Sequence, residues 1–181
     1  MRSFLTVLFL ILATAVTAVA QDRSVVLSGN LTKFSIDVVD NADEYAQGFG
    51  LQGSFRFLGA RGKASGLRAR VVADFQRNNT EVFHDYMTPM GPIDIYRDVN
   101  TYSAGAGLGY KVGPVEPFAN YLLGAEKRHE MFNYELARTV QAGARLYLGP
   151  VVLEPFRIQF KGNGTKPLQL FGYSVGAGLT F

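Results

Sequence analysis

The chain has 181 residues, 48% of them hydrophobic and 18% charged, with 20 glycines, 14 phenylalanines and 9 tyrosines but no cysteine. This length suits a single domain, and the composition is too apolar for a disordered chain. Without cysteine the protein has no disulfide, thiolate metal site, thiol nucleophile or lipid-modified cysteine.

The first 20 residues have the pattern of a secretory signal peptide. Met1 and Arg2 form a short basic start, residues 4–16 are apolar or small, and Ala18 and Ala20 are spaced as at a signal peptidase site. The apolar stretch is shorter than the ~20 residues of a transmembrane helix, which disfavours a retained anchor. We expect cleavage after Ala20, leaving residues 21–181 as one domain with 17 basic and 15 acidic side chains. A net charge of +2 argues against nucleic acid as a partner.

The rest of the chain alternates between apolar and polar or small residues, as half-buried strands do. In residues 102–112, Tyr102, Leu108 and Tyr110 share one face, and Ser103 and Lys111 share the other with three glycines. The pattern predicts eight strands, at residues 25–38, 47–57, 67–76, 102–112, 115–127, 140–148, 151–161 and 171–181. An even number of strands suits a closed, all-β, antiparallel up-and-down barrel.

The connections between these strands alternate in length. Residues 58–66, 113–114 and 149–150 predict turns at one end of the barrel, whereas residues 78–98 predict a long loop at the other. In the first strand the alternation slips between Leu31 and Phe34, which predicts a β-bulge.

The positions of the glycines indicate which face of the strands points inward. Gly105, Gly107 and Gly109 lie on the polar face, where they would weaken an exposed strand but would leave room inside a narrow barrel for side chains from the opposite wall. The apolar face then points to lipid. Its aromatics form two expected girdles, with Phe55, Phe57, Tyr110 and Phe181 at the turn end and Phe49, Phe75, Tyr102 and Phe171 toward the loop end.

The signal peptide, the eight strands and the last strand, which runs from Tyr173 to an aromatic Phe181, resemble the OmpA-like family of eight-stranded outer-membrane β-barrels. The resemblance implies a monomeric transmembrane barrel in a Gram-negative outer membrane, surrounded by lipid and lipopolysaccharide, with periplasmic termini. It also implies that the barrel-assembly machinery reads the last strand through Tyr173 and Phe181. The alternative is a soluble periplasmic barrel of lipocalin type, which the absence of tryptophan disfavours.

Charged residues on the polar face form a candidate site in the lumen. A narrow porin-like channel would use an arginine-lined lumen as a selectivity filter. The favoured interpretation is structural, because side chains fill an eight-stranded barrel and buried charges must pair. The members of this cluster are Arg56, Arg68, Arg70, Asp74, Arg145 and Arg157, with Lys111, Lys161, Glu116, Glu126 and Glu154 as possible additions.

Catalysis and cofactor binding have little support in the sequence. His84 and His129 are the only histidines, and no serine lies near either, so a lipid-modifying enzyme is the least favoured function and no metal or cofactor is expected. The favoured function is a structural or surface-binding barrel without an open pore. A surface-binding role would fall to the long loop, which either binds a partner or folds over the barrel mouth; its apolar residues include Phe83, Tyr86, Met87, Met90 and Tyr96.

Overall fold

The computed structural model describes residues 23–35, 43–59, 65–89, 91–128, 134–164 and 167–181, so the expected signal peptide lies outside the described residues. Its strands are β1 (Arg23–Ser35), β2 (Asp43–Leu58), β3 (Ser65–Thr88), β4 (Gly91–Val112), β5 (Val115–Arg128), β6 (Glu135–Leu148), β7 (Val151–Asn163) and β8 (Gln169–Thr180). The part of the chain that the structure describes contains no helix with the length and hydropathy of a membrane span.

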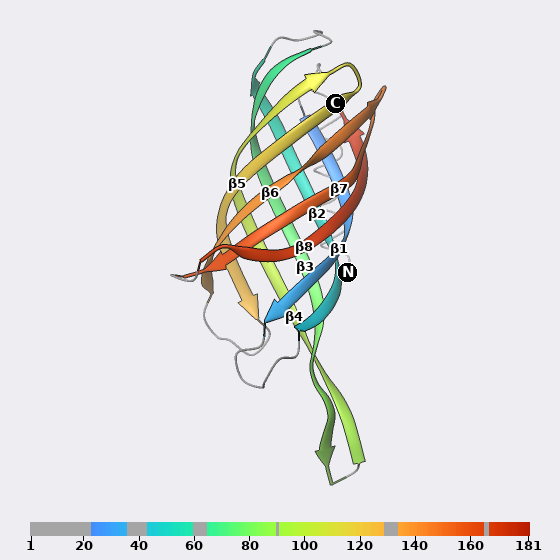
Figure 1. Cartoon of the computed structure of the whole chain (residues 1–181), viewed down its shortest axis with the longest axis vertical. Coiled ribbons are helices and arrows are strands. Elements are labelled where there is room, and N and C mark those ends of the chain that lie inside the picture. Colours follow the sequence, from blue (N-terminus) through green and yellow to red (C-terminus); the bar gives the residue numbers. More distant parts are fainter. Residues whose placement is uncertain (1–22, 36–42, 60–64, 90, 129–133, 165–166) are drawn as a thin grey trace, which may run out of the picture.

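The eight strands form a closed barrel. Each strand pairs antiparallel with the next along the chain, and β8 closes the barrel against β1 (Figure 1). At the end of this closing ladder Arg23 and Phe181 exchange two backbone hydrogen bonds, with N···O distances of 3.2 and 2.9 Å. Closure leaves no unpaired sheet edge around the barrel wall. The predicted all-β, eight-stranded antiparallel barrel is confirmed.

Two of the three predicted turns are tight. Val112 pairs with Val115 and Leu148 pairs with Val151, which leaves two residues in each connection. Gly113 and Gly149 occupy the first loop position with φ of 56° and 65°, where a type II′ turn requires glycine. The third connection joins Leu58 to Ser65, and residues 60–64 within it lie outside the described residues.

The bulge predicted in the first strand is wrong. The ladder between β1 and β2 runs from Arg23 opposite Phe55 to Ser35 opposite Asp43 without a shift of register. Backbone hydrogen bonds do not depend on side-chain type, so an apolar residue out of phase near the end of a strand does not force a bulge.

The long loop predicted at residues 78–98 is also wrong, because β3 and β4 continue past the barrel as a two-stranded ribbon (Figure 1). The ladder from β2 to β3 ends at Asn79, and the ladder from β4 to β5 ends at Val99. In the ladders of the described residues, residues 80–98, here called the ribbon, pair only with one another and with Asn79, and the register shifts twice along them. Their valine, isoleucine, phenylalanine and tyrosine content favours extended backbone, and pairing satisfies backbone groups that a loop would leave to water.

The barrel is polar inside and apolar outside. Among the described residues, buried polar and charged side chains outnumber buried hydrophobic ones by 24 to 9. The expected girdle aromatics Phe49, Phe55, Phe57, Tyr102 and Tyr110 are all exposed, and every strand also carries at least one exposed aliphatic residue.

Candidate functional site

The lumen holds three groups of buried polar side chains, stacked along the barrel. The turn-end cluster consists of Arg56, Arg68, Arg70, Glu116 and Tyr147. The central network consists of Gln52, Asp74, Gln76, Asn120, Gln141, Arg145, Glu154 and Arg157. The loop-end group consists of Thr101, Glu126 and Lys161. All six residues of the predicted lumen cluster lie in the first two groups and are at most 9% exposed.

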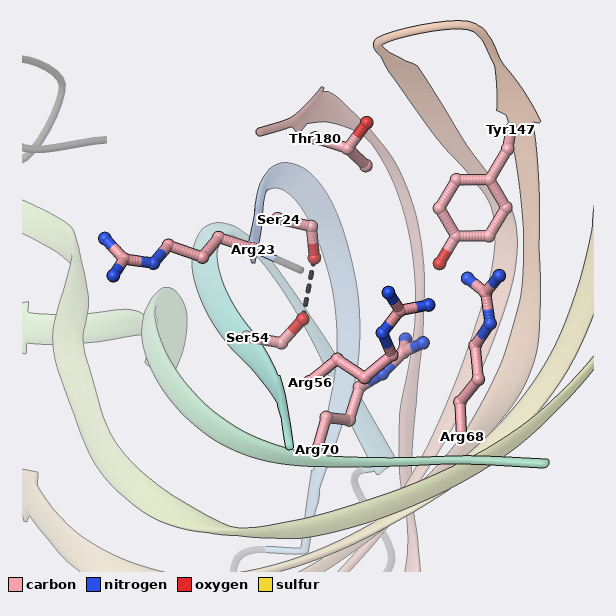
Figure 2. Close-up of a pocket in the computed structure, with 8 residues that line it drawn as sticks. All are labelled: Arg23, Ser24, Ser54, Arg56, Arg68, Arg70, Tyr147 and Thr180. Atoms are coloured by element: carbon pink, nitrogen blue, oxygen red, sulfur yellow. Dashed lines mark hydrogen bonds between the residues drawn. The ribbon is translucent and has the colours of Figure 1, made fainter. Parts of the chain in front are cut away.

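The turn-end cluster gathers three arginines around one carboxylate. Glu116 on β5 forms ion pairs with Arg70 and with Arg68, the latter at 3.5 Å, and accepts a hydrogen bond of 3.2 Å from the Tyr147 hydroxyl. Arg56 reaches the same place from β2, and Figure 2 shows its guanidinium group turned toward those of Arg68 and Arg70. Lys111 lies close by, with its amino group 4.8 Å from the centre of the Tyr147 ring. Several cationic side chains therefore lie near one another at this end of the lumen.

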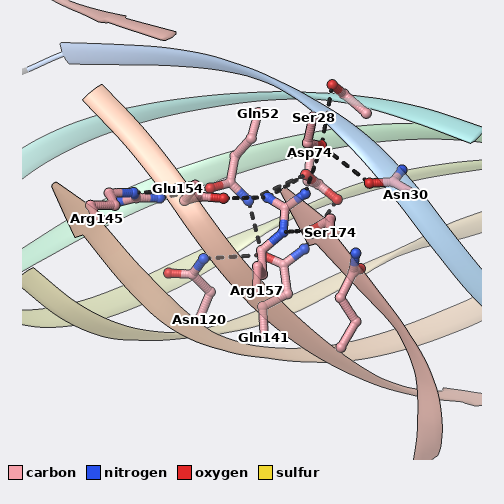
Figure 3. A network of polar contacts seen from close by, with 12 residues as sticks. Ser28, Asn30, Gln52, Asp74, Asn120, Gln141, Arg145, Glu154, Arg157 and Ser174 are labelled. Atoms are coloured by element: carbon pink, nitrogen blue, oxygen red, sulfur yellow. Dashed lines mark hydrogen bonds and ion pairs between the residues drawn. The ribbon is translucent and has the colours of Figure 1, made fainter. Parts of the chain in front are cut away.

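The central network has balanced charges. Glu154 on β7 accepts a hydrogen bond of 2.9 Å from Arg145 and lies 3.3 Å from Arg157 (Figure 3). Arg157 also faces Asp74, at 3.7 Å, and donates hydrogen bonds to two serine hydroxyls, Ser174 at 2.8 Å and Ser28 at 3.0 Å. Two arginines thus meet two carboxylates.

Amides complete the central network. Asp74 accepts hydrogen bonds from Gln52 (3.2 Å), Gln76 (2.6 Å) and Gln141 (3.2 Å), and Gln141 accepts one from Asn120 (3.0 Å) (Figure 3). Side chains from β2, β3, β5 and β6 therefore meet across the centre of the barrel. Buried carboxylates and guanidinium groups need such partners to offset the loss of hydration.

The loop-end group is a third pairing across the lumen. Lys161 on β7 forms an ion pair with Glu126 on β5 and donates a hydrogen bond of 2.8 Å to Thr101 on β4. Its amino group also lies 4.5 Å from the centre of the Phe171 ring.

The prediction that Phe171 belongs to the outer girdle is wrong, because the side chain of Phe171 is buried. The register between β7 and β8 shifts at this point: Gln159 lies opposite Gly172 and Phe160 lies opposite Leu170. Phe171 is the extra residue, so the bulge reverses the direction that simple alternation predicts for its side chain.

The glycines on the inner face make room for neighbouring strands and not, as expected, for the opposite wall. A Cβ atom on Gly109 would lie 2.5 Å from the Glu116 carboxylate, and one on Gly107 would collide with the Asn120 amide. Both partners belong to β5, next to the glycine strand β4. The absence of side chains here lets the polar groups of β5 lean over β4.

Several lumen residues did not stand out in the sequence. The alternation of strand residues places Gln52, Gln76 and Gln141 on the polar face, but an uncharged amide carries no sequence signal that marks it as a lumen residue. Apolar residues also face inward: Val72, Leu122 and Val152 are fully buried. The expectation of a polar lumen does not predict these inward-facing apolar side chains.

The structure describes the two histidines and the apolar residues of the expected binding loop only in part. The ribbon pairs the backbone of Phe83, Tyr86, Met87 and Tyr96, and His84 lies in the register shift between Phe83 and Tyr86, but their side chains are not described. Met90 and His129 lie outside the described residues. Among the residues that are described, no three His, Asp or Glu side chains are grouped to hold a metal ion.

No family model and no curated protein matches the sequence, but solved structures share the fold. The attachment invasion locus protein Ail of Yersinia pestis, in complex with the heparin analogue sucrose octasulfate, has a TM-score of 0.54 at 16% identity, covering 90% of this chain and 100% of that one. Neisserial surface protein A has a TM-score of 0.52 at 18% identity, covering 88% and 97%. A structure of the outer membrane protein Ail in a phospholipid nanodisc has a TM-score of 0.48 at 17% identity, covering 90% and 100%. The likenesses with TM-scores above 0.5 show that the chain shares its fold with Ail and with Neisserial surface protein A.

Proposed function

We propose that the protein is a small integral outer-membrane β-barrel with a structural or surface-binding role. The observation that carries the proposal is the distribution of side chains: charged groups are buried in the lumen, whereas leucine, valine, phenylalanine and tyrosine cover the outside. In water such a surface would promote aggregation, but in a bilayer it meets lipid, and a closed barrel satisfies its backbone hydrogen bonds internally. The fold shared with Ail and with the Neisserial surface protein supports the same placement.

In this proposal both chain ends lie in the periplasm, on the side of the short turns, and the ribbon projects from the cell. The adjacency of Arg23 and Phe181 at the turn end supports a common side for both ends. The aromatic end of β8, with Tyr173 and Phe181, is the segment that the barrel-assembly machinery would read. Lipid and lipopolysaccharide surround a monomer.

The surface-binding role falls to the ribbon. The ladders of β2 and β5 end before the ribbon, so its two edges are not paired with these strands and a partner could add a strand there. The ribbon carries Glu81, Asp85, Asp94 and Asp98 against Arg97, a net charge of −3 with histidine neutral. A sulfated ligand such as that bound to Ail would be repelled by this charge, so we favour an apolar or basic protein segment as the partner. Phe83, Tyr86, Met87, Met90 and Tyr96 would supply the apolar contacts.

We further propose that the lumen does not conduct and that the protein is not an enzyme. Ion pairs lie in the lumen at three levels, Arg70 with Glu116, Arg145 with Glu154 and Lys161 with Glu126, which disfavours the narrow-channel alternative.

Cell fractionation combined with surface proteolysis tests the placement. We expect the protein in the outer-membrane fraction, migrating differently on gels with and without boiling, and we expect external protease to cut only the loop end of intact cells. Recovery from the soluble periplasm without detergent would instead favour the lipocalin-type barrel. Cleavage at the 59–64 turn in intact cells would reverse the proposed orientation.

A further inference from the structure

The two strands of the ribbon differ in regularity. Glu81 and Phe83 of β3 are separated by one residue, but their partners on β4, Tyr96 and Ile95, are neighbours. The partners of Phe83 and Tyr86 are likewise one residue closer together than Phe83 and Tyr86 are. At both register shifts the additional residue therefore belongs to β3, whereas β4 runs through this stretch without one (Figure 1).

This difference makes the two edges unequal as sites for an added strand. A bulge leaves a residue unpaired and bends its strand, and natural sheets use bulges to prevent pairing at an edge. The β3 edge has two bulges. The β4 edge is regular from Ile93 to Asp98, between Pro92, which has no N–H to donate, and Val99, where the ladder to β5 begins. In the ladders of the described residues, the β4 edge is therefore the one suited to continuous pairing.

The sequence of the β4 edge specifies what kind of strand fits it. Alternate residues of a strand share one face, so Asp94, Tyr96 and Asp98 lie on one face and Ile93 and Ile95 on the other, followed there by an arginine. Opposite charges on facing strands are stabilising, and like charges are destabilising. A strand that matches this edge has basic residues opposite the two aspartates and apolar residues opposite the two isoleucines.

We propose that the β4 edge of the ribbon, residues 93–98, is the docking site for an extended basic segment of another protein, which adds to it as an antiparallel strand. The added strand then has the same direction relative to β4 as β5 has within the barrel. A second copy of this chain is a poorer occupant, because its ribbon carries the same negative net charge. The proposal rests on the surface-binding role proposed for the ribbon, and it names the edge and the chemistry of the partner.

Hydrogen exchange with a synthetic peptide tests the proposal. The purified full-length barrel in detergent is mixed with the peptide Lys-Val-Thr-Val-Lys-Val, whose lysines are spaced to face Asp98 and Asp94 in an antiparallel ladder. Mass spectrometry should show slower amide exchange at residues 93–98 and unchanged exchange at residues 80–88. The peptide Glu-Val-Thr-Val-Glu-Val should give no protection, because it places like charges opposite each other. A lysine peptide that is N-methylated throughout should give none either, because it has no N–H groups for the ladder.

Charge reversal on each edge provides matched variants. Asp94→Lys combined with Asp98→Lys should abolish protection by the lysine peptide and produce protection by the glutamate peptide. Glu81→Lys combined with Asp85→Lys makes the same change of charge on β3 and should retain protection of residues 93–98 by the lysine peptide.

Three results would overturn the proposal: protection of residues 80–88, equal loss of protection in the two charge variants, or no protection of wild type by the lysine peptide. Protection of residues 80–88 would leave the surface-binding role in place and move it to the other edge. The gel shift without boiling, measured on the same samples, reports whether each variant is a folded barrel. A failure of the barrel is thereby distinguished from a failure of the docking site.

Discussion

Glu154 holds together two arginines that belong to different strands. It is fully buried, and its two oxygens face Arg145 of β6 and Arg157 of its own strand, β7. Glu154 therefore links both arginines of the central network, whereas Asp74 faces Arg157.

Glu154→Gln should destabilise the barrel. The substitution preserves the volume of the side chain but leaves Arg145 and Arg157 without their shared counter-charge, and breaking a buried ion pair costs about 3–5 kcal/mol. Urea unfolding in lipid vesicles, followed by circular dichroism, measures the free energy of unfolding. Glu135→Gln, the same change at a partly exposed position of β6, should stay within about 0.5 kcal/mol of wild type. Similar values for the two variants would contradict the role given to Glu154.

The substitution Val71→Arg tests whether the outer surface of the barrel faces lipid. Val71 is 52% exposed and lies near the middle of the barrel part of β3. If that surface faces lipid, arginine there costs about 2–4 kcal/mol, and the folded fraction in the membrane should fall. Val71→Ile is the control and should behave as wild type. In a soluble barrel the arginine would face water, so unchanged stability of Val71→Arg would argue against the membrane placement.

At the level of elements, the ribbon and the barrel are separable. The barrel strands are paired on both sides, whereas in the described ladders residues 80–98 pair only within the hairpin of β3 and β4. A two-stranded hairpin on its own is marginally stable, so it contributes little to the barrel beneath it.

Replacing residues 80–97 with Asn-Gly should leave the barrel intact. Asn79 and Asp98 are already paired, and Asn-Gly favours the tight turn that would join them. We expect unchanged outer-membrane levels and an unfolding midpoint close to that of wild type, measured by the gel shift without boiling. A control in which the same residues are kept but Tyr86 and Tyr96 become serine preserves the length of the ribbon. Loss of the folded band in the shortened variant would show that the ribbon supports the barrel.

The end of β8 is the second element with a separate role. Phe181 closes the barrel through its backbone bonds to Arg23 and carries the expected assembly signal on its side chain. Phe181→Asp should reduce insertion into the membrane while export continues, and Phe181→Tyr should insert normally. Quantitative blots of membrane and periplasmic fractions decide this, and wild-type membrane levels of Phe181→Asp would refute the assembly role.

For the whole molecule, the polar groups that cross the lumen predict a barrel without a pore. Purified protein in a planar bilayer should give no large, steady conductance, because Gln52, Asp74 and Gln141 from three strands meet across its centre. Glu154→Gln serves as a comparison, since it loosens the central network. Steady single-channel currents from wild type would revive the narrow-channel alternative.

The sequence alone determined the class of fold, the tight turns and the inward direction of the arginines. Each of these is a local property: alternation has a period of two residues whatever the strand pairs with, and glycine marks a turn by its own backbone conformation. Residues 67–76 and 102–112 could therefore be recognised without knowledge of their neighbours.

Only the tertiary structure decided which groups meet. Gln52 hydrogen-bonds to Gln141, 89 residues further along the chain, because closure and register bring β2 and β6 to the same level of the lumen. The inward turn of Phe171 follows from a register shift against β7, and the ribbon follows from where the ladders of β2 and β5 end. Register depends on how two strands pair, so the alternation of residues within a single strand does not predict it.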